Sequence, residues 1–180
     1  MKHYNGRPAS LEGRSDAEVG TYDFLDRLGV NYDTFCHDAA FTMEECAEVE
    51  RQVDAHIFKN LFLCNRQQTQ FYLLMLPADK VFKTKFLSAE LGCSRLSFAT
   101  ADHMESLLHI HPGAVSPMGL IYESEGKVLP VLDEDLLQFS EVGCHPCVNT
   151  ATLKLHLRDL REKFIPATGH NLTVVKLKTE

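Results

Sequence analysis

The chain has 180 residues, of which 44% are hydrophobic and 24% charged, a composition typical of one soluble globular domain. Its formal net charge of −7 argues against broad binding to a phosphate backbone, although it allows a local basic pocket. No apolar run reaches the length of a membrane span, and residues 1–14 lack the apolar core of a signal peptide, so we expect a cytoplasmic protein with no membrane partner.

Hydrophobic spacing predicts a strand between two helices in the first third of the chain. Ser15 with Glu18 is typical of a capping box, and the apolar stripe that follows ends at Gly29. Residues 30–37 alternate apolar and polar side chains, as a half-exposed strand does. Thr42 has the same kind of signal and opens the second helix.

Residues 56–65 form a nearly continuous apolar run without proline or glycine, which predicts a strand. Lys59 and Asn60 interrupt the run, and burying an unpaired ammonium group costs on the order of several kcal/mol. Lys59 therefore lies on an exposed side of the strand or faces an anion such as a phosphate. Residues 66–69 predict a turn into a second strand at 71–76, so the two strands form a hairpin.

The rest of the chain mixes helices and strands without strict alternation. Helical spacing is expected at 78–92, 100–108 and 156–164, and strands are expected at 118–123, 127–133, 149–155 and 172–179. This mixture predicts an α+β fold, with a single domain built on one central mixed β-sheet flanked by helices.

Residues 111–120 read HPGAVSPMGL, in which two prolines, two glycines and a serine predict a tight loop that enters a strand. Small residues in such a loop let main-chain amides approach a ligand, although a plain turn is the alternative. His109 and His111 form an H-x-H pair, but the sequence places no third ligand, so we expect no metal.

Cys144 and Cys147 form a C-x-x-C motif, while the other four cysteines are scattered singly and read as reduced, buried thiols. A zinc half-site needs a second pair of ligands, which is missing. A redox dithiol needs a following helix, whereas the next residues predict a strand. What remains is a turn in which Pro146 fixes His145, and such a turn suits a positioned, hydrogen-bonding imidazole.

Five segments in this order resemble the YbaK/ProX family, the freestanding relatives of the editing domain inserted in bacterial prolyl-tRNA synthetases. The segments are FKNLFL, LLMLPADK, LSFAT, HPGAVSPMGL and GCHPCVNTATLKL. The resemblance runs over nearly the whole chain and is strongest to the ProX branch. It divides the chain into a polar N-terminal segment at 1–14 and a YbaK-type, aminoacyl-tRNA synthetase-associated editing domain at 15–180.

The resemblance implies a trans-editing deacylase that hydrolyses the ester of alanine mischarged onto tRNA(Pro). The expected partners are the 3′ end of that tRNA and prolyl-tRNA synthetase, with no cofactor. Cysteinyl- or seryl-tRNA is the alternative substrate. A non-catalytic module that binds tRNA or a synthetase, and a thiol oxidoreductase, are the alternative classes of protein.

The resemblance also implies which residues carry the reaction. Lys59 would hold a phosphate or ribose of the terminal adenosine. Asn60, the backbone around Gly143, and His145 would orient the amino acid, the ester carbonyl and a water molecule. A ribose hydroxyl of the substrate would help to activate that water, without a covalent intermediate and without a metal.

The remaining expected site residues bind the substrate. The turn that contains Gly113, Ser116 and Pro117 would line a pocket that admits alanine and excludes proline. Pro146 would hold the turn of the histidine. Lys83, together with Lys80 and Lys85, would meet the acceptor stem, unless these lysines are solvated helix charges.

Overall fold

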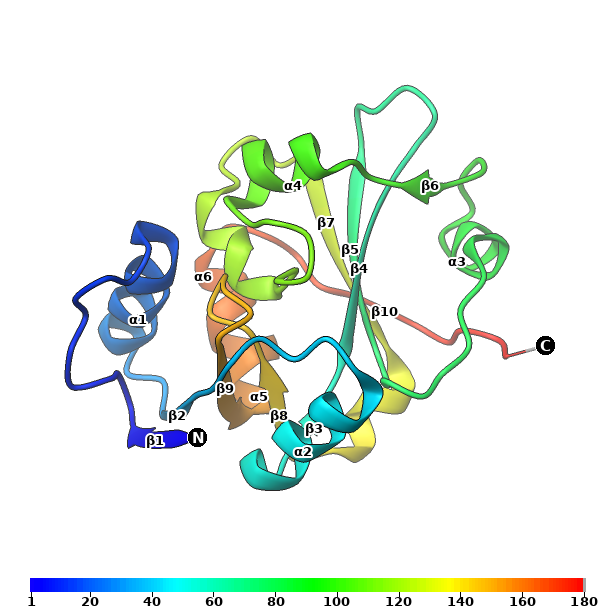
Figure 1. The fold of residues 1–180 in the computed structure, drawn as a ribbon. Coiled ribbons are helices and arrows are strands. Elements are labelled where there is room, and N and C mark those ends of the chain that lie inside the picture. The colour runs from blue at the N-terminus through cyan, green and yellow to red at the C-terminus, as the bar shows by residue number, and fades with distance from the viewer. Residues whose placement is uncertain (180) are drawn as a thin grey trace.

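The computed structural model describes residues 1–179, whose ten strands form two sheets (Figure 1). The strands are β1 (Lys2–Asn5), β2 (Tyr32–Cys36), β3 (His56–Ile57), β4 (Lys59–Cys64), β5 (Phe71–Leu76), β6 (Ser97–Phe98), β7 (Val128–Asp133), β8 (Glu141–Cys144), β9 (Ala151–His156) and β10 (Thr173–Val175). The first sheet has the order β1-β2-β9-β8-β3, and the second has the order β10-β7-β5-β4-β6. The structure confirms the α+β class, and it divides between two sheets the strands that the sequence assigns to one.

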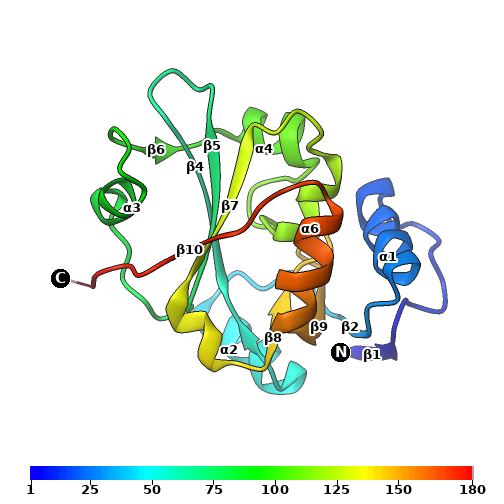
Figure 2. The same ribbon diagram turned by 180° about the vertical axis from the view of Figure 1, so that it is seen from behind.

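Helices surround the two sheets. They are α1 (Asp16–Leu28), α2 (Met43–Val53), α3 (Thr84–Leu91), α4 (Ala101–Leu108), the 3₁₀ helices η1 (Pro117–Tyr122) and η2 (Glu134–Gln138), α5 (Leu157–Asp159), the π-helical η3 (Leu160–Phe164) and α6 (Ile165–Ala167). Figures 1 and 2 show α1 and α3 on opposite sides of the molecule. Within residues 1–179, every helix is too short or not apolar enough to cross a bilayer.

The two predicted N-terminal helices are confirmed with their end signals. The Ser15 hydroxyl accepts a hydrogen bond of 3.2 Å from the main-chain N–H of Glu18, and α1 ends at Gly29 with a φ of 69°. Thr42 and Glu45 form the reciprocal capping box of α2. These contacts satisfy amides that the first helical turn leaves without partners. The local sequence therefore decides where each helix begins.

The predicted strand at 56–65 is divided between the two sheets. Ile57 of β3 pairs with Gly143 in a parallel ladder of the first sheet, whereas β4 pairs antiparallel with β5 in the second sheet. Phe58, which is 3% exposed, lies between the two strands. Lys59 therefore stands at the point where the chain leaves one sheet for the other, which explains how a lysine can interrupt an apolar run.

The predicted strand at 118–123 is wrong, because this segment forms the 3₁₀ helix η1. Ser116 caps the helix by accepting a hydrogen bond of 3.2 Å from the main-chain N–H of Met118, and Pro117 occupies the first helical position. Proline with a capping serine favours a helical start. The segment is apolar because it is buried, so its composition alone does not separate a strand from a helix.

The predicted helix at 78–92 begins later than expected, at Thr84. Residues 77–83 form an irregular loop, and the ammonium group of Lys80 is drawn inward to Asp133, the last residue of β7, and to Asp135 of η2. Val81 is 61% exposed and Phe82 is only partly buried, so the apolar residues of this loop do not form a helical stripe.

Three of the predicted strands, at 71–76, 127–133 and 149–155, are confirmed as β5, β7 and β9. The final strand, predicted at 172–179, is shorter and lies beside β7 as β10 (Figure 2). Strands β1 and β8 were not predicted, since each has only four residues. The predicted N-terminal segment at 1–14 contributes β1 to the first sheet, and its boundary with the rest of the chain stays a prediction.

Candidate active site

A cleft of about 430 Å³ opens between α2 and the crossing from β3 to β4. Lys59, Gly113 and His145, three residues singled out from the sequence, line this cleft together. An inner pocket of about 210 Å³ shares Ile57, Gly113 and His145 with the cleft and adds Asn60. The structure therefore brings four of the predicted site residues to one place.

The Lys59 side chain is half-buried, and it is held at its tip. Its Nζ donates a hydrogen bond of 2.6 Å to the main-chain oxygen of Lys80. Among the described residues Lys59 forms no ion pair, although Glu50 and Asp79 also line the cleft. A carbonyl oxygen fixes the direction of the ammonium group without neutralising its charge, so the nitrogen retains donors for an anionic ligand.

His145 is fixed through one ring nitrogen. Its Nδ1 lies 2.8 Å from the main-chain oxygen of Ala151, and since a carbonyl oxygen only accepts, Nδ1 carries the proton. The neutral ring then has an unprotonated Nε2, which has no protein partner among residues 1–179. Burial lowers the pKa of His145, the Ala151 hydrogen bond opposes this effect, and His37 adds a smaller lowering. The imidazole is therefore a hydrogen-bond acceptor at neutral pH.

Asn60 and Gly113 shape the inner pocket. The Oδ1 atom of Asn60 is buried and has no hydrogen-bond partner among the residues that the structure describes. A buried acceptor of this kind is costly unless a ligand or a water supplies a donor. Gly113 has a φ of 91°, which favours glycine, and a side chain there would begin 3.8 Å from the Asn149 amide nitrogen. Gly113 therefore contributes its main chain to the walls of both the cleft and the inner pocket.

Gly143, which the resemblance places in the reaction, lies in β8 and does not line the cleft or the inner pocket. A Cβ atom at this position would stand 2.8 Å from Cγ1 of Ile57 and 3.3 Å from Cγ2 of Thr152. Glycine thus lets β3 pack closely against β8, and it sets the position of Ile57 in the wall of the site. Its catalytic role stays a prediction.

Ser116, Pro117 and Pro146 are buried and do not line the site either. The hydroxyl of Ser116 is used in capping η1. Lys83 is exposed and precedes α3, where it borders a separate groove with Lys85 and Arg95. These residues position the surrounding elements, and their contact with a substrate stays a prediction.

Several residues of the cleft were not singled out from the sequence, among them His37, Glu50, Asn149 and Thr152. The Nε2 atom of His37 lies 2.9 Å from the Thr152 hydroxyl, and its Nδ1 lies 2.8 Å from the main-chain oxygen of Asp38. Both ring nitrogens are therefore used inside the protein. The sequence offered one signal for these residues, which is the position of His37 at the end of a predicted strand. The others could not be singled out, because they meet only in the tertiary fold.

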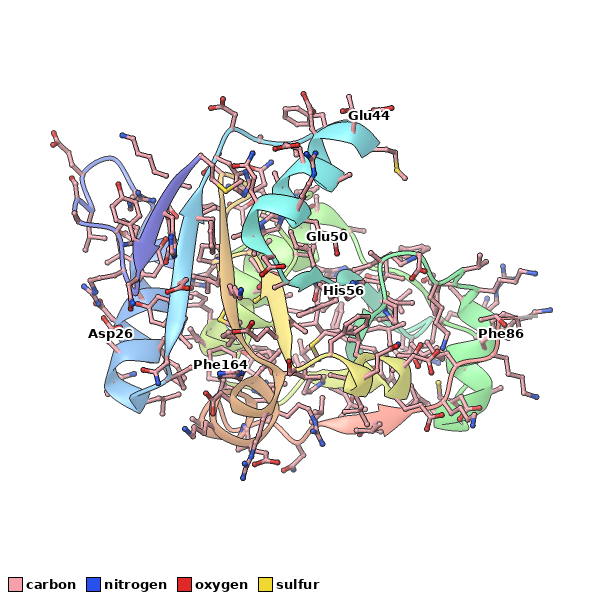
Figure 3. All side chains as sticks on the ribbon, turned by 90° about the horizontal axis from the view of Figure 1, so that it is seen from below. Asp26, Glu44, Glu50, His56, Phe86 and Phe164 are labelled. Carbon is pink, nitrogen blue, oxygen red and sulfur yellow. The ribbon has the colours of Figure 1, made fainter. Side chains whose placement is uncertain are left out.

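Helix α2 is anchored over the cleft by Glu50. Its Oε1 accepts a hydrogen bond of 3.2 Å from the main-chain N–H of Ile57 and lies 3.2 Å from Nδ1 of His56. Figure 3 shows Glu50 on α2 close to His56, whose ring also stacks on Phe139 with centroids 4.1 Å apart. Met43 and Cys46 of the same helix line the cleft. The anchoring thus holds the outer wall of the site in place.

The C-x-x-C motif does not form a reactive dithiol. Cys144 and Cys147 are free and buried, and burial raises the pKa of each thiol to about 12. At neutral pH both stay protonated, whereas thiol chemistry needs the thiolate. Burial and the raised pKa values therefore argue against the thiol oxidoreductase alternative. Residues 1–179 contain no group of three or more His, Cys, Asp or Glu side chains placed to hold a metal ion.

Comparisons with known proteins place this chain in a class, that of domains which hydrolyse aminoacyl-tRNA esters. Residues 37–163 match the family model described as the aminoacyl-tRNA editing domain, which is more than half of the chain. The chain belongs to this family. The membership confirms the predicted resemblance and the predicted class of hydrolase.

Relatives of known sequence and structure agree with this assignment. The prolyl-tRNA editing protein ProX of Acetoanaerobium sticklandii is 35% identical over 90% of this chain and 98% of its own length. Prolyl-tRNA synthetase associated domain-containing protein 1 of Danio rerio is 29% identical over 85% of this chain and 83% of its own. A crystal structure of a candidate trans-editing enzyme for prolyl tRNA synthetase has a TM-score of 0.68 and 18% identity, covering 91% of this chain and 99% of its own, and shows the shared fold.

Proposed function

We propose that this protein is a trans-editing deacylase that hydrolyses the ester of alanine mischarged onto tRNA(Pro). The observation that carries the proposal is that Lys59, Gly113 and His145 line one cleft, while Asn60 lines the inner pocket that adjoins it. The 35% identity to a prolyl-tRNA editing protein supports proline tRNA as the RNA.

Lys59 binds the terminal nucleotide of the RNA. Lys59 lines the cleft, and the contact of its ammonium group with the carbonyl oxygen of Lys80 leaves its positive charge available. A phosphate or ribose oxygen placed there gains a charge-assisted hydrogen bond. The chain carries a net charge of −7, so the RNA is recognised at this local site and not over a broad basic surface.

Hydrolysis uses a water molecule that attacks the ester carbonyl carbon. The bond between this carbon and the ribose oxygen breaks, and the proton lost by the water reaches the departing ribose oxygen. His145 Nε2 accepts a hydrogen bond from the water or from the neighbouring ribose hydroxyl, and so orients the attack. The Oδ1 atom of Asn60 accepts a hydrogen bond from the amino group of the amino acid, which satisfies an otherwise unpartnered acceptor.

The selection by size takes place in the inner pocket. A synthetase site built for proline rejects the smaller alanine weakly, since each missing methylene changes binding by about 1–3 kcal/mol. A second pocket that is too small for proline removes the error without harming the correct product. The tightly packed, buried walls of Cys144 and Phe58 favour a small side chain.

The proposal is tested by incubating the purified protein with tRNA(Pro) charged separately with alanine, serine, cysteine or proline. We expect release of alanine and retention of proline. Release of cysteine or serine in preference to alanine would assign one of the alternative substrates. Binding of the tRNA without release of any amino acid would assign a non-catalytic module. The partnership with prolyl-tRNA synthetase stays a prediction.

A further inference from the structure

Lys80 is a buried lysine with two acidic partners. Its Nζ lies 2.6 Å from Oδ2 of Asp133 and 2.7 Å from Oδ2 of Asp135, and its side chain is only 6% exposed. The Asp133 carboxylate is fully buried, whereas that of Asp135 is half exposed. Burial lowers the pKa of Lys80, but its contacts with the two aspartates outweigh this effect and raise the pKa, so the ammonium group stays charged.

The main chain of the same residue contacts the candidate active site. The carbonyl oxygen of Lys80 accepts the 2.6 Å hydrogen bond from Nζ of Lys59, and its N–H donates 3.1 Å to the oxygen of Pro77. Lys80 therefore joins the end of β7 to the tip of Lys59 through one residue. The irregular loop at 77–83 has no ladder hydrogen bonds of its own to hold it in place.

We propose that Lys80 is a positioning residue, whose ion pairs with Asp133 and Asp135 hold its carbonyl oxygen at the place that orients the Lys59 ammonium group. This inference rests on one part of the proposed function, namely that Lys59 binds the substrate. Lys80 itself touches no substrate, because its ammonium group is directed to the aspartates and away from the cleft, which its side chain does not line. This placement also corrects the expectation that Lys80 meets the acceptor stem.

Two physical arguments favour positioning over stability alone. A lysine side chain has several rotatable bonds, and its ammonium group is placed reproducibly only when a fixed acceptor holds it. A buried ion pair, by contrast, is often no more stabilising than apolar residues of the same volume. The ion pairs hold the loop at 77–83 in one position. An apolar replacement of the same volume could keep the stability, but it would not hold the loop in this way.

A double-mutant cycle separates positioning from a general structural effect. We expect Lys80→Met to lower kcat/KM for alanyl-tRNA(Pro) by about tenfold, and Lys80→Arg, which keeps the ion pairs, to restore most of it. In a Lys59→Ala background, Lys80→Met should change kcat/KM by less than about twofold, because the group that it positions is gone. Lys127→Met, at an exposed lysine paired with Glu125, is the matched control and should leave kcat/KM unchanged. Equal, additive losses in both backgrounds would overturn the proposal.

Lys80→Met leaves the buried Asp133 carboxylate unpaired, so this variant is made together with Asp133→Asn if it folds poorly. A second readout does not depend on turnover. The method is competitive acetylation of lysine amines, followed by peptide mass spectrometry. Lys59 should be labelled faster in Lys80→Met, alone or combined with Asp133→Asn, than in the parent protein. In Lys127→Met it should be labelled at the parent rate. An unchanged labelling rate of Lys59 would overturn the positioning role of Lys80, whether or not the parent protein is active. Failure of the parent protein to release any amino acid would instead overturn the proposed function.

Discussion

Lys59 and His145 line one cleft although they are carried by different sheets. Lys59 opens β4 of the second sheet, and His145 directly follows β8 of the first sheet. Their meeting depends on the single residue Phe58, at which the chain passes from β3 to β4. The candidate site therefore lies at the junction of the two sheets.

Replacing Lys59 by alanine should lower deacylation while the fold is retained. A hydrogen bond to a charged group contributes about 1.5–3 kcal/mol, which corresponds to about a 10- to 100-fold loss in kcat/KM. The side chain is half-buried and its one protein partner is a carbonyl oxygen, so we expect a loss in unfolding free energy below about 1.5 kcal/mol. Kinetics and thermal denaturation measure the two effects. A large loss of stability with unchanged kinetics would instead assign Lys59 a structural role.

The pH dependence of the reaction should report the neutral state of His145. Burial lowers its pKa below the ordinary value of 6.5, so the ring stays neutral as the pH falls through 6.5 and becomes protonated only at lower pH. We therefore expect kcat/KM to hold at pH 6.5 and to fall in more acidic buffer.

The same shift links His145 to stability. The unfolded chain binds a proton at this histidine more readily than the folded protein does, so the stabilisation that the shift implies is present above pH 6.5 and declines as the pH falls below it. His145→Asn should remove this contribution and the acidic limb of the rate profile. A rate that falls with a midpoint above pH 6.5 would contradict the assignment.

Local signals in the sequence were sufficient for the parts of the fold that depend on neighbouring residues. The caps at Ser15 and Thr42 and the hairpin of β4 and β5 are of this kind, since each depends on contacts between residues close in the chain. The interrupted run around Lys59 also drew attention to a residue that lines the candidate cleft, because an ammonium group among apolar residues needs a physical reason.

Other parts depend on contacts that no local pattern records. The division into two sheets depends on the pairing of Ile57 with Gly143, which are far apart in the chain. The inward course of Lys80 depends on aspartates more than fifty residues away. His37 and Asn149 enter the cleft for the same reason, through the tertiary fold. The sequence thus indicated some of the polar residues of the candidate site, but not the residues that form its walls.

Adding a methyl group at Gly143 should disturb the site through Ile57, which lines the cleft. The new Cβ would lie 2.8 Å from Cγ1 of Ile57, so β3 or this side chain must move. Overpacking of this kind costs about 1–3 kcal/mol. We expect Gly143→Ala to lower the unfolding free energy by this amount and to reduce kcat/KM, as measured by urea denaturation and by alanine release. Combining it with Ile57→Ala, which removes the crowded atom, should recover part of the stability.

Failure of that combination to recover any stability would show that the glycine is needed for a reason other than its contact with Ile57. The matched control is Gly126→Ala. This glycine lies in an exposed turn with a φ of 69°, and a Cβ there meets no atom within 4 Å. Its substitution carries the backbone cost of a left-handed residue but no crowding, so stability should fall slightly and kcat/KM should not change.

The paired cysteines should be dispensable for the reaction. Cys144 and Cys147 are 2% and 5% exposed, and burial holds the pKa of each near 12, so neither supplies a thiolate near neutral pH. We expect iodoacetamide to modify the exposed Cys46 in the native protein and to reach the buried pair only after unfolding. Cys144→Ala with Cys147→Ala should lower stability by about 1–2 kcal/mol through lost packing. It should retain deacylation of alanyl-tRNA(Pro), because a shorter side chain at position 144 widens the inner pocket and does not block alanine. Rapid native modification of the pair, or a loss of activity greater than the loss of folded protein, would restore a chemical role for the motif.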